Sequence, residues 1–255
     1  MPEQFLTTEF MGQLANQVLT LFKLLRFAKL MNIPMNQVIV NGSVYGCSGI
    51  NPRKYGKKCE KGFLLNRIDF FSNISSVIVD EEEWERRTQS VSFVDCKEDE
   101  KKAIAAWTNG DSVRLGKNLL YPATGEERKL IKEWFLNETL YNQAKQELID
   151  QGIDPTSAVA LHIRRTDFQD YHDGQYLLTK EQINDSIKEV PPENQLVIFS
   201  DDMKWCKENI FRSKGEIIFN NPGTDTQDLL RLAACSKLIK NPGSSFSNLA
   251  GLLHK

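Results

Sequence analysis

The sequence predicts an α/β protein with parallel sheets, and its second half shows the pattern most clearly. Short apolar runs, typical of buried strands, alternate there with segments of helical spacing. Strands joined by helices pack as parallel neighbours with the helices on the sheet faces. The chain has 255 residues, which is ample for two domains. We expect them at 1–155 and 156–255, separated after the helix-stopping segment Gly152–Pro155.

The first half contains two helical patterns and several strand candidates. Apolar residues recur at helical spacing over 12–31, which predicts an amphipathic helix. A longer, more polar helix is predicted over 126–151. Short apolar runs predict strands at 38–40, 77–79 and 91–94.

Four helices and four strands are predicted in the second half. Thr179 and Gln182 have the spacing of a capping box, so one helix should begin at 180. Asp201 or Asp202 is expected to cap the next helix, which runs through Asn209. The other helices are predicted at 225–235 and 244–253, and the strands at 158–163, 196–199, 216–219 and 238–239.

Charged and hydroxyl side chains follow three of these predicted strands, and they come directly after the first two. The first strand is followed by Arg164–Asp167, the second by Ser200–Asp202, and the last by Ser244–Ser247. The carboxyl ends of parallel strands lie at one edge of a sheet, where α/β proteins bind ligands. We therefore expect these side chains to meet at one ligand site.

Two features of this edge indicate a diphosphate ligand. The guanidinium groups of Arg164 and Arg165 could clamp phosphate oxygens, and a serine-rich helix start at Ser244 could bind an anion. Each feature also has a plainer explanation, because arginines form surface ion pairs and serines cap helices. Their coincidence at one sheet edge makes a diphosphate the better interpretation.

The acidic pair Asp201 and Asp202 leaves two interpretations open. Paired carboxylates hold magnesium, but they also cap helices or bind a purine and a ribose. We expect no metal and no cofactor, since arginines would already neutralise the diphosphate. The glycines at 42, 46 and 49 do not form a dinucleotide or Walker phosphate loop.

The net charge and the hydropathy limit the classes of partner and the cellular locations that we expect. A formal net charge of −2 gives no basic field for nucleic acid. No segment has the apolar length of a membrane span, and the N-terminus lacks the pattern of a signal peptide. We expect a chain that is cytoplasmic or peripheral to a membrane, and lumenal only if a native anchor has been removed.

The motifs at these strand ends resemble those of α-1,2-fucosyltransferases, glycosyltransferase family 11. The resemblance rests on a hexapeptide, 162–167, and on three later motifs, in the family's order and spacing: 199–206, 225–230 and 244–247. Gly12–Gln17 also looks like the family's N-terminal motif, with Gln13 and Ala15 in place of an arginine and a glycine. The hexapeptide is similar to that of α-1,6-fucosyltransferases, and the N-terminal motif to that of protein O-fucosyltransferases.

The resemblance implies a GT-B-like fold, two Rossmann-like domains with a cleft between them. It also implies an inverting, metal-independent transfer of L-fucose from GDP-fucose to a glycan or glycoprotein acceptor. Arg164 would bind the β-phosphate and assist its departure, while His162 and Asp202 would meet the guanosine. The other residues expected to bind substrate are Gln13, Asn16, Arg165, Asp167, Asp201, Ser244, Ser245 and Phe246.

Gln13 and Ala15 leave an alternative function open. The chain could be a catalytically weak or silent relative that binds a GDP-sugar or a glycan. A protein O-fucosyltransferase is a further alternative.

A general base for the acceptor is expected in the segment that follows the arginines. This segment, 168–174, carries three candidates: Asp170, His172 and Asp173. Histidine is attractive because its unperturbed pKa, about 6.5, lies near working pH. A polar lid is the alternative role for the segment.

Overall fold

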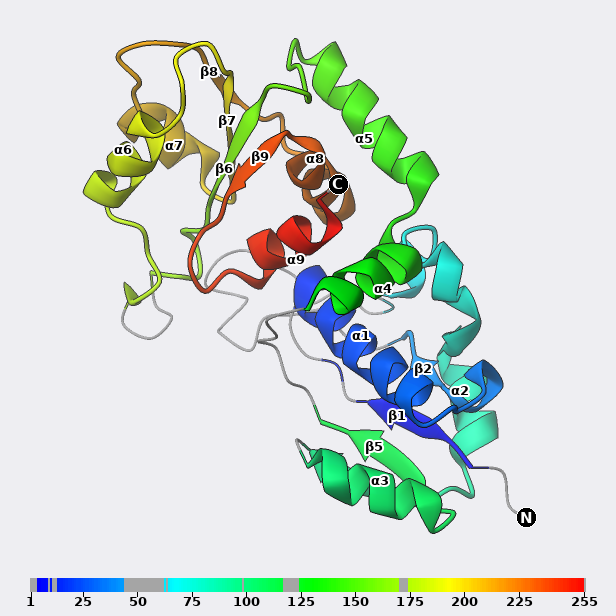
Figure 1. The fold of residues 1–255 in the computed structure, drawn as a ribbon. Coiled ribbons are helices and arrows are strands. Elements are labelled where there is room, and N and C mark those ends of the chain that lie inside the picture. Colours follow the sequence, from blue (N-terminus) through cyan, green and yellow to red (C-terminus); the bar gives the residue numbers. More distant parts are fainter. Residues whose placement is uncertain are drawn as a thin grey trace. The chain divides into compact units, whose positions relative to one another are not determined.

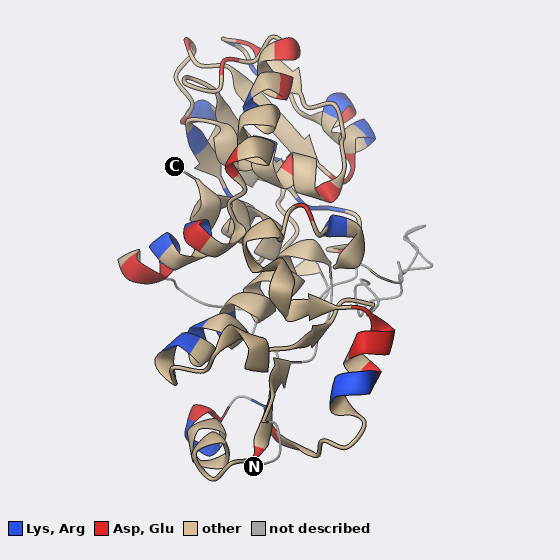
Figure 2. Ribbon diagram, turned by 90° about the vertical axis from the view of Figure 1, so that its right-hand side faces the viewer, with Lys and Arg blue, Asp and Glu red and all other residues tan. Residues whose placement is uncertain are grey.

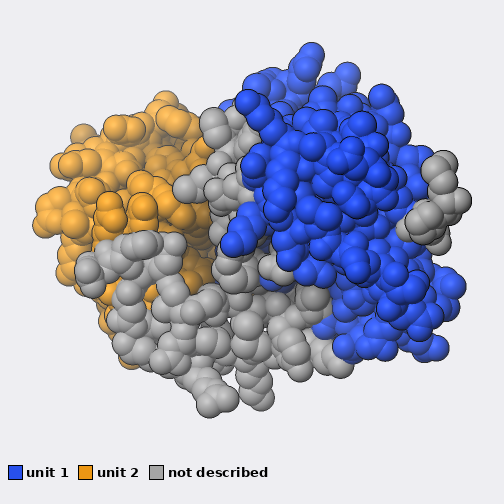
Figure 3. Space-filling view, turned by 90° about the horizontal axis from the view of Figure 1, so that it is seen from below, with its two compact units in different colours: residues 1–135 blue, residues 136–255 orange. Residues whose placement is uncertain are grey.

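The computed structural model describes residues 4–8, 10, 13–43, 62, 64–97, 99–116, 124–169 and 174–254 (Figure 1). The chain forms two compact units, unit 1 over residues 1–135 and unit 2 over residues 136–255 (Figure 3). Each unit contains parallel strands and helices, so the predicted α/β class is confirmed. None of the described helices is long and apolar enough to cross a membrane.

Unit 1 is built on parallel strands with helices between them. Its sheet has the strand order β1-β5-β4, and β2 pairs with β3 in parallel. A parallel bridge between Leu6 and Val38 brings β1 and the residues before β2 side by side. The elements are β1 (Leu6–Thr8), α1 (Leu14–Leu30), β2 (Val40–Asn41), β3 (Ile78–Val79), α2 (Glu81–Thr88), β4 (Phe93–Lys97), α3 (Glu100–Thr108), β5 (Ser112–Leu115) and α4 (Gly125–Phe135), with short 3-10 turns at Met35–Gln37, Leu65–Arg67 and Ser72–Val77.

The helix α1 confirms the prediction over 12–31. Its apolar residues are buried, among them Leu14, Val18, Leu21 and Leu25. The helix α2 was not predicted, although its charge pattern suits a helix. Glutamates occupy its first turn and arginines its last, which complements the helix dipole (Figure 2).

The single helix predicted over 126–151 is wrong. The chain forms α4 and then α5 (Glu138–Asp150), with a break at Leu136 and Asn137. Asn137 has extended backbone angles, and its side chain accepts hydrogen bonds from the backbone N–H groups of Thr139 and Leu140. An N-cap of this kind starts a new helix and ends the preceding one.

The division between the units falls at this break. α4 lies in unit 1, whereas α5 lies in unit 2 and packs against α8 (Asp225–Ala234). The expected boundary at residue 155 and the boundary at residue 135 therefore differ by this one helix.

Unit 2 follows the predicted alternation of strands and helices. Pairing in parallel, its strands have the order β8-β7-β6-β9. The chain thus extends the sheet in one direction from β6 to β8 and then returns to the other side of β6 with β9. The remaining elements are β6 (Val159–Ile163), α6 (Lys180–Lys188), β7 (Leu196–Ser200), α7 (Met203–Asn209), β8 (Ile217–Phe219), β9 (Lys237–Ile239) and α9 (Ser245–Leu253).

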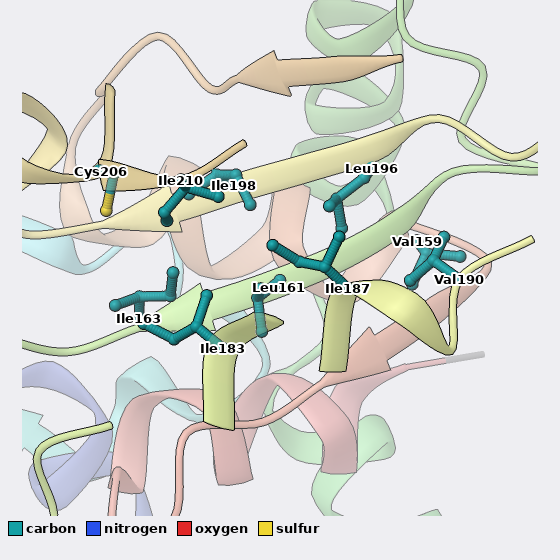
Figure 4. Packing of buried hydrophobic residues seen from close by; sticks show 10 residues of the cluster. All are labelled: Val159, Leu161, Ile163, Ile183, Ile187, Val190, Leu196, Ile198, Cys206 and Ile210. Carbon is teal, nitrogen blue, oxygen red and sulfur yellow. The ribbon is translucent and has the colours of Figure 1, made fainter. Parts of the chain in front are cut away.

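The core of unit 2 explains which strand residues face the helices α6 and α7. Alternate residues of β6, Val159, Leu161 and Ile163, pack with Ile183 and Ile187 of α6 (Figure 4). Successive side chains of a strand point to opposite faces. His162 therefore lies on the other face of the sheet.

The predicted caps of unit 2 are present. Thr179 and Gln182 form both halves of a capping box at α6. Asp202, the second of the two predicted candidates, caps α7 by accepting the N–H of Trp205. Ser244 caps α9, so this helix begins at Ser245.

Candidate functional site

The topological switch point of the unit 2 sheet lies between the paired strands β6 and β9. At such a point the two connections leave in opposite directions and open a crevice beyond the strand ends. The segments that begin at Arg164, Asp201 and Asn241 follow β6, β7 and β9. The sheet therefore brings together the strand ends that the sequence indicated.

The side chain of Arg164 is held by two carboxylates. Its Nε and Nη2 atoms donate to the Oδ1 and Oδ2 atoms of Asp167 at 2.7 and 2.8 Å. Nε also lies 3.3 Å from Oδ2 of Asp201. Burial opposes the charge of Arg164, but the hydrogen bond to Asp167 and the two negative charges outweigh it and raise the pKa of the guanidinium. Arg164 is therefore a fixed cation at the end of β6.

Asp201 shapes the turn that carries the arginines. Its Oδ1 accepts the backbone N–H of Arg165 at 2.8 Å, and its carboxylate also accepts the N–H and the hydroxyl of Thr166. A carboxylate that accepts several donors from one turn fixes the backbone there. Asp201 was expected to bind substrate, and in this structure its oxygens bind the turn 164–166.

Arg165 is placed differently from its neighbour. Its guanidinium lies over the indole ring of Trp205, 3.5 Å from the ring centroid. Its Nε is 3.9 Å from Oδ2 of Asp202, too far for a hydrogen bond. The side chain is 11% exposed, so Arg165 is a nearly buried cation held mainly by an aromatic face.

Asn241 joins the ends of β6 and β9. Its buried side chain accepts the backbone N–H of Arg164 through Oδ1 at 2.8 Å and donates to the carbonyl oxygen of Tyr176 at 3.1 Å. Its own carbonyl oxygen accepts the N–H of Ser244, the cap of α9. Asn241 thus fixes the start of α9 relative to Arg164, through its backbone carbonyl at Ser244 and its side chain at Arg164.

The start of α9 offers backbone N–H groups and hydroxyls. The hydroxyl of Ser244 accepts the N–H of Ser247 at 3.5 Å, and Ser245 and Phe246 are half-buried. The N-terminal end of a helix attracts anions. This arrangement suits the phosphate-binding role expected for the serines.

Gly243 allows the chain to enter α9. Its φ is +73°, and a Cβ atom there would lie 2.5 Å from the ring of Tyr176. Only glycine combines this backbone angle with this close approach. Gly243 therefore sets the path between Asn241 and the serines.

His162 is a neutral, buried side chain in this site. It lies on the sheet face toward α9, with its ring 5.4 Å from that of Phe246. Burial, and next the charge of Arg164, lower its pKa to about 3. Its Nδ1 atom has no hydrogen-bond partner in the described part of the chain. A buried polar atom of this kind suits a ligand contact.

The remaining candidates fall into two groups. Gln13 precedes α1 and Asn16 lies in its first turn, both half-buried in unit 1. Asp170, His172 and Asp173, proposed as bases, lie outside the described residues. Over the described ranges, no group of three or more His, Cys, Asp or Glu side chains is placed to hold a metal ion.

Two residues of this site were missed by sequence reasoning. Asn241 precedes the Pro-Gly pair before the serines, and Trp205 lies three residues after the cap Asp202. The local sequence gives each a common structural role, a turn residue and a helix residue. Their contacts with Arg164 and Arg165 depend on strand pairing, which their own segments do not reveal.

A family model and several known proteins match this chain. Residues 118–255 match the family model described as Glycosyl transferase family 11. Galactoside alpha-(1,2)-fucosyltransferase 2 of Sus scrofa is 27% identical over 155 residues, which are 53% of this chain and 44% of that protein. The chain thus spans less than half the length of this curated relative.

Solved structures resemble the whole chain at low identity. POFUT1 in complex with GDP-fucose aligns with a TM-score of 0.57 and 13% identity, covering 99% of this chain and 94% of that one. Fucosyltransferase NodZ from Bradyrhizobium aligns with a TM-score of 0.52 and 13% identity, with the same coverage. At this identity the similarity shows a shared fold.

Proposed function

Because the chain belongs to glycosyl transferase family 11, we propose that it transfers L-fucose from GDP-fucose to a hydroxyl group of a glycan acceptor. The transfer inverts the configuration at the anomeric carbon and requires no metal ion. The relatives named as fucosyltransferases support the sugar and the reaction, and the POFUT1 structure in complex with GDP-fucose supports the donor.

One observation carries this proposal. Asn241 holds the backbone of Arg164 and the capped start of α9 together at the switch point of the sheet. A guanidinium cation and a helix N-terminus at one place form a site for a strongly anionic group. The diphosphate of a nucleotide sugar has this chemistry.

The same groups stabilise the leaving group. The acceptor hydroxyl attacks the anomeric carbon as the bond to the β-phosphate oxygen breaks, and GDP leaves with the bonding electrons. Arg164 and the N–H groups of α9 stabilise the charge that grows on the β-phosphate. The acceptor proton passes to a base in the segment 168–174, with Asp170, His172 and Asp173 as candidates. Because Asp167 occupies two donors of Arg164, the phosphate competes with this carboxylate or shares the guanidinium with it.

The nucleoside end of the donor meets His162 and Asp202. The Nδ1 atom of His162 is buried and has no hydrogen-bond partner among the residues that the structure describes, so a hydrogen bond from the ligand would satisfy it. Asp202 uses Oδ1 to cap α7, and its side chain stays partly exposed. Phe246, whose ring lies 5.4 Å from that of His162, and Ser245 complete this side of the site.

Turnover decides between this function and the alternatives. The purified chain is incubated with GDP-fucose and separate panels of glycan and folded glycoprotein acceptors, and GDP release is measured. We expect release above the acceptor-free background with a glycan. Release only with protein acceptors would indicate a protein O-fucosyltransferase. GDP binding by calorimetry without turnover on any acceptor would indicate a silent GDP-sugar-binding relative.

A second panel tests the donor. GDP-fucose is replaced by GDP-mannose or by UDP-sugars at equal concentration. We expect turnover with GDP-fucose alone. Preferential turnover of another donor would overturn the proposed sugar while leaving the transferase function.

A further inference from the structure

Arg165 is a nearly buried cation to which the described residues give no side-chain hydrogen bond. Its Nε atom is fully enclosed and has no partner, and the nearest carboxylate oxygen, of Asp202, is 3.9 Å away. A guanidinium carries five N–H donors, and burying such a group without hydrogen bonds is costly. Ligand oxygens at the exposed part of this side chain, which is 11% exposed, would offset the cost.

The neighbouring arginine provides the contrast. Arg164 has two donors on Asp167 and a second carboxylate, that of Asp201, at 3.3 Å. An incoming anion would have to share or displace these carboxylates at Arg164. At Arg165 it would meet a guanidinium that is hydrogen-bonded to no oxygen of the described residues.

An aromatic face takes the place of the missing hydrogen bonds. The guanidinium lies 3.5 Å from the ring centroid of Trp205, within the range of a strong cation–π contact. Stacking of this kind neutralises part of the burial cost and leaves the N–H groups in the guanidinium plane available. The ring is fixed in turn, because Asp202 accepts the N–H of Trp205 and caps α7.

Resting on the proposed function, we propose that Trp205 is a positioning residue whose ring holds Arg165 as the main ground-state contact of the nucleotide diphosphate. Arg165 supplies affinity for GDP and for the GDP-sugar. Arg164, held by Asp167, contributes chiefly when charge grows on the leaving phosphate. The two adjacent arginines thus divide binding and catalysis between them.

The test measures GDP binding by calorimetry in variants of the full chain. Trp205→Leu removes the π-face, and we expect the Kd for GDP to rise about 10-fold. Trp205→Phe keeps an aromatic face and should stay within about 3-fold of the wild type. Guanosine lacks the phosphates, so its affinity should be equal in all three proteins.

A double-mutant cycle separates positioning from a general structural effect. Arg165→Ala should weaken GDP binding, and adding Trp205→Leu to it should weaken binding no further, because the ring acts through the guanidinium. Trp107→Leu, which removes a half-buried tryptophan of α3 in unit 1, is the matched control and should leave GDP affinity unchanged. Melting temperatures report whether each variant is folded.

Four results would count against these proposals in distinguishable ways. Additive losses in the cycle, or an equal loss of guanosine and GDP affinity in Trp205→Leu, would overturn the positioning role. Wild-type GDP affinity in a folded Trp205→Leu protein would do the same. No GDP binding by the wild type would overturn the proposed function itself, and the inference with it.

Discussion

The guanidinium of Arg164 and the carboxylate of Asp167 form a two-bonded ion pair within one turn of chain, with N···O distances of 2.7 and 2.8 Å. Both side chains are largely buried. The guanidinium at the end of β6 remains protonated, and the carboxylate of Asp167 balances its charge in the absence of ligand. Because both side chains are largely buried, removing Arg164 or Asp167 leaves the other charge buried.

Substituting Arg164 separates its catalytic and structural roles. Arg164→Lys keeps the charge but loses the planar fork, and we expect kcat to fall about 100-fold or more while the chain stays folded. Arg164→Ala should abolish transfer and also lower the free energy of unfolding by about 3 kcal/mol, since Asp167 loses its buried partner. Steady-state GDP release and urea unfolding measure the two effects.

The control for Arg164 is an exposed arginine. Arg86 pairs with Glu83 on the surface of α2, and Arg86→Ala should leave turnover unchanged. Near wild-type kcat in Arg164→Lys would contradict the diphosphate role.

His162 should make the protein less stable in acid. Its pKa is about 3 in the folded chain against 6.5 for an unperturbed histidine, so the unfolded chain binds the extra proton between these values. Stability from this residue is complete above about pH 6.5 and declines as the pH falls toward 3. Between pH 7 and pH 5 the loss is about 2 kcal/mol.

The variant His162→Gln removes the contribution of this histidine to the pH dependence of the free energy of unfolding. Urea unfolding at pH 7 and pH 5 should show a smaller pH-dependent loss in the variant than in the wild type. Identical pH dependence in both proteins would mean that His162 is not held neutral.

Gly243 should resist substitution more than a comparable glycine. Gly243 and Gly152 share a positive φ, +73° and +77°, but a Cβ atom meets the ring of Tyr176 only at Gly243. Gly152→Ala should cost about 1 kcal/mol of unfolding free energy, the strain of the backbone angle. Gly243→Ala should cost about 2–4 kcal/mol, because the overlap with Tyr176 adds to that strain. Equal losses would show that the loop relaxes around the new methyl group.

Chelation tests the metal-independent transfer. We expect GDP release with EDTA present to equal release without it, because Arg164 and the start of α9 supply the positive charge that a metal would otherwise provide. Magnesium or manganese added afterwards should not increase the rate. Turnover that EDTA abolishes and magnesium restores would overturn the prediction.

The acceptor base is predicted among Asp170, His172 and Asp173. Replacing the base by alanine should lower kcat about 100-fold while GDP affinity stays unchanged. Single alanine variants, assayed for kcat and for GDP binding by calorimetry, identify it. If all three keep kcat within a few-fold of the wild type, the base lies elsewhere or the reaction proceeds without one.

Periodicity in the sequence was enough to predict unit 2. Its four strands are apolar runs flanked by caps and prolines, so local rules predicted each helix and strand after α5, with ends shifted by one or two residues. Unit 1 was harder. The apolar runs at 38–40 and 77–79 predicted β2 and β3 to within two residues, but β1, α2, α3 and β5 were not predicted. The strands β1 and β5 are only three and four residues long and carry little periodic signal. The helix pair α4 and α5 was joined in error, since the capping geometry of Asn137 is a backbone property that composition does not reveal.

The sequence by itself determined which side chains stand at the strand ends of unit 2. A buried strand followed by Arg164, Arg165 and Asp167 places charge at a sheet edge whatever the neighbours are, because strand length and polarity are local properties. The tertiary structure alone decided how those side chains are used. It turns Asp201 toward the backbone of Arg165 and lays the Arg165 guanidinium on Trp205. These contacts join residues brought together by the parallel pairing of β6 with β7, and a pairing between distant segments is a property of the whole sheet.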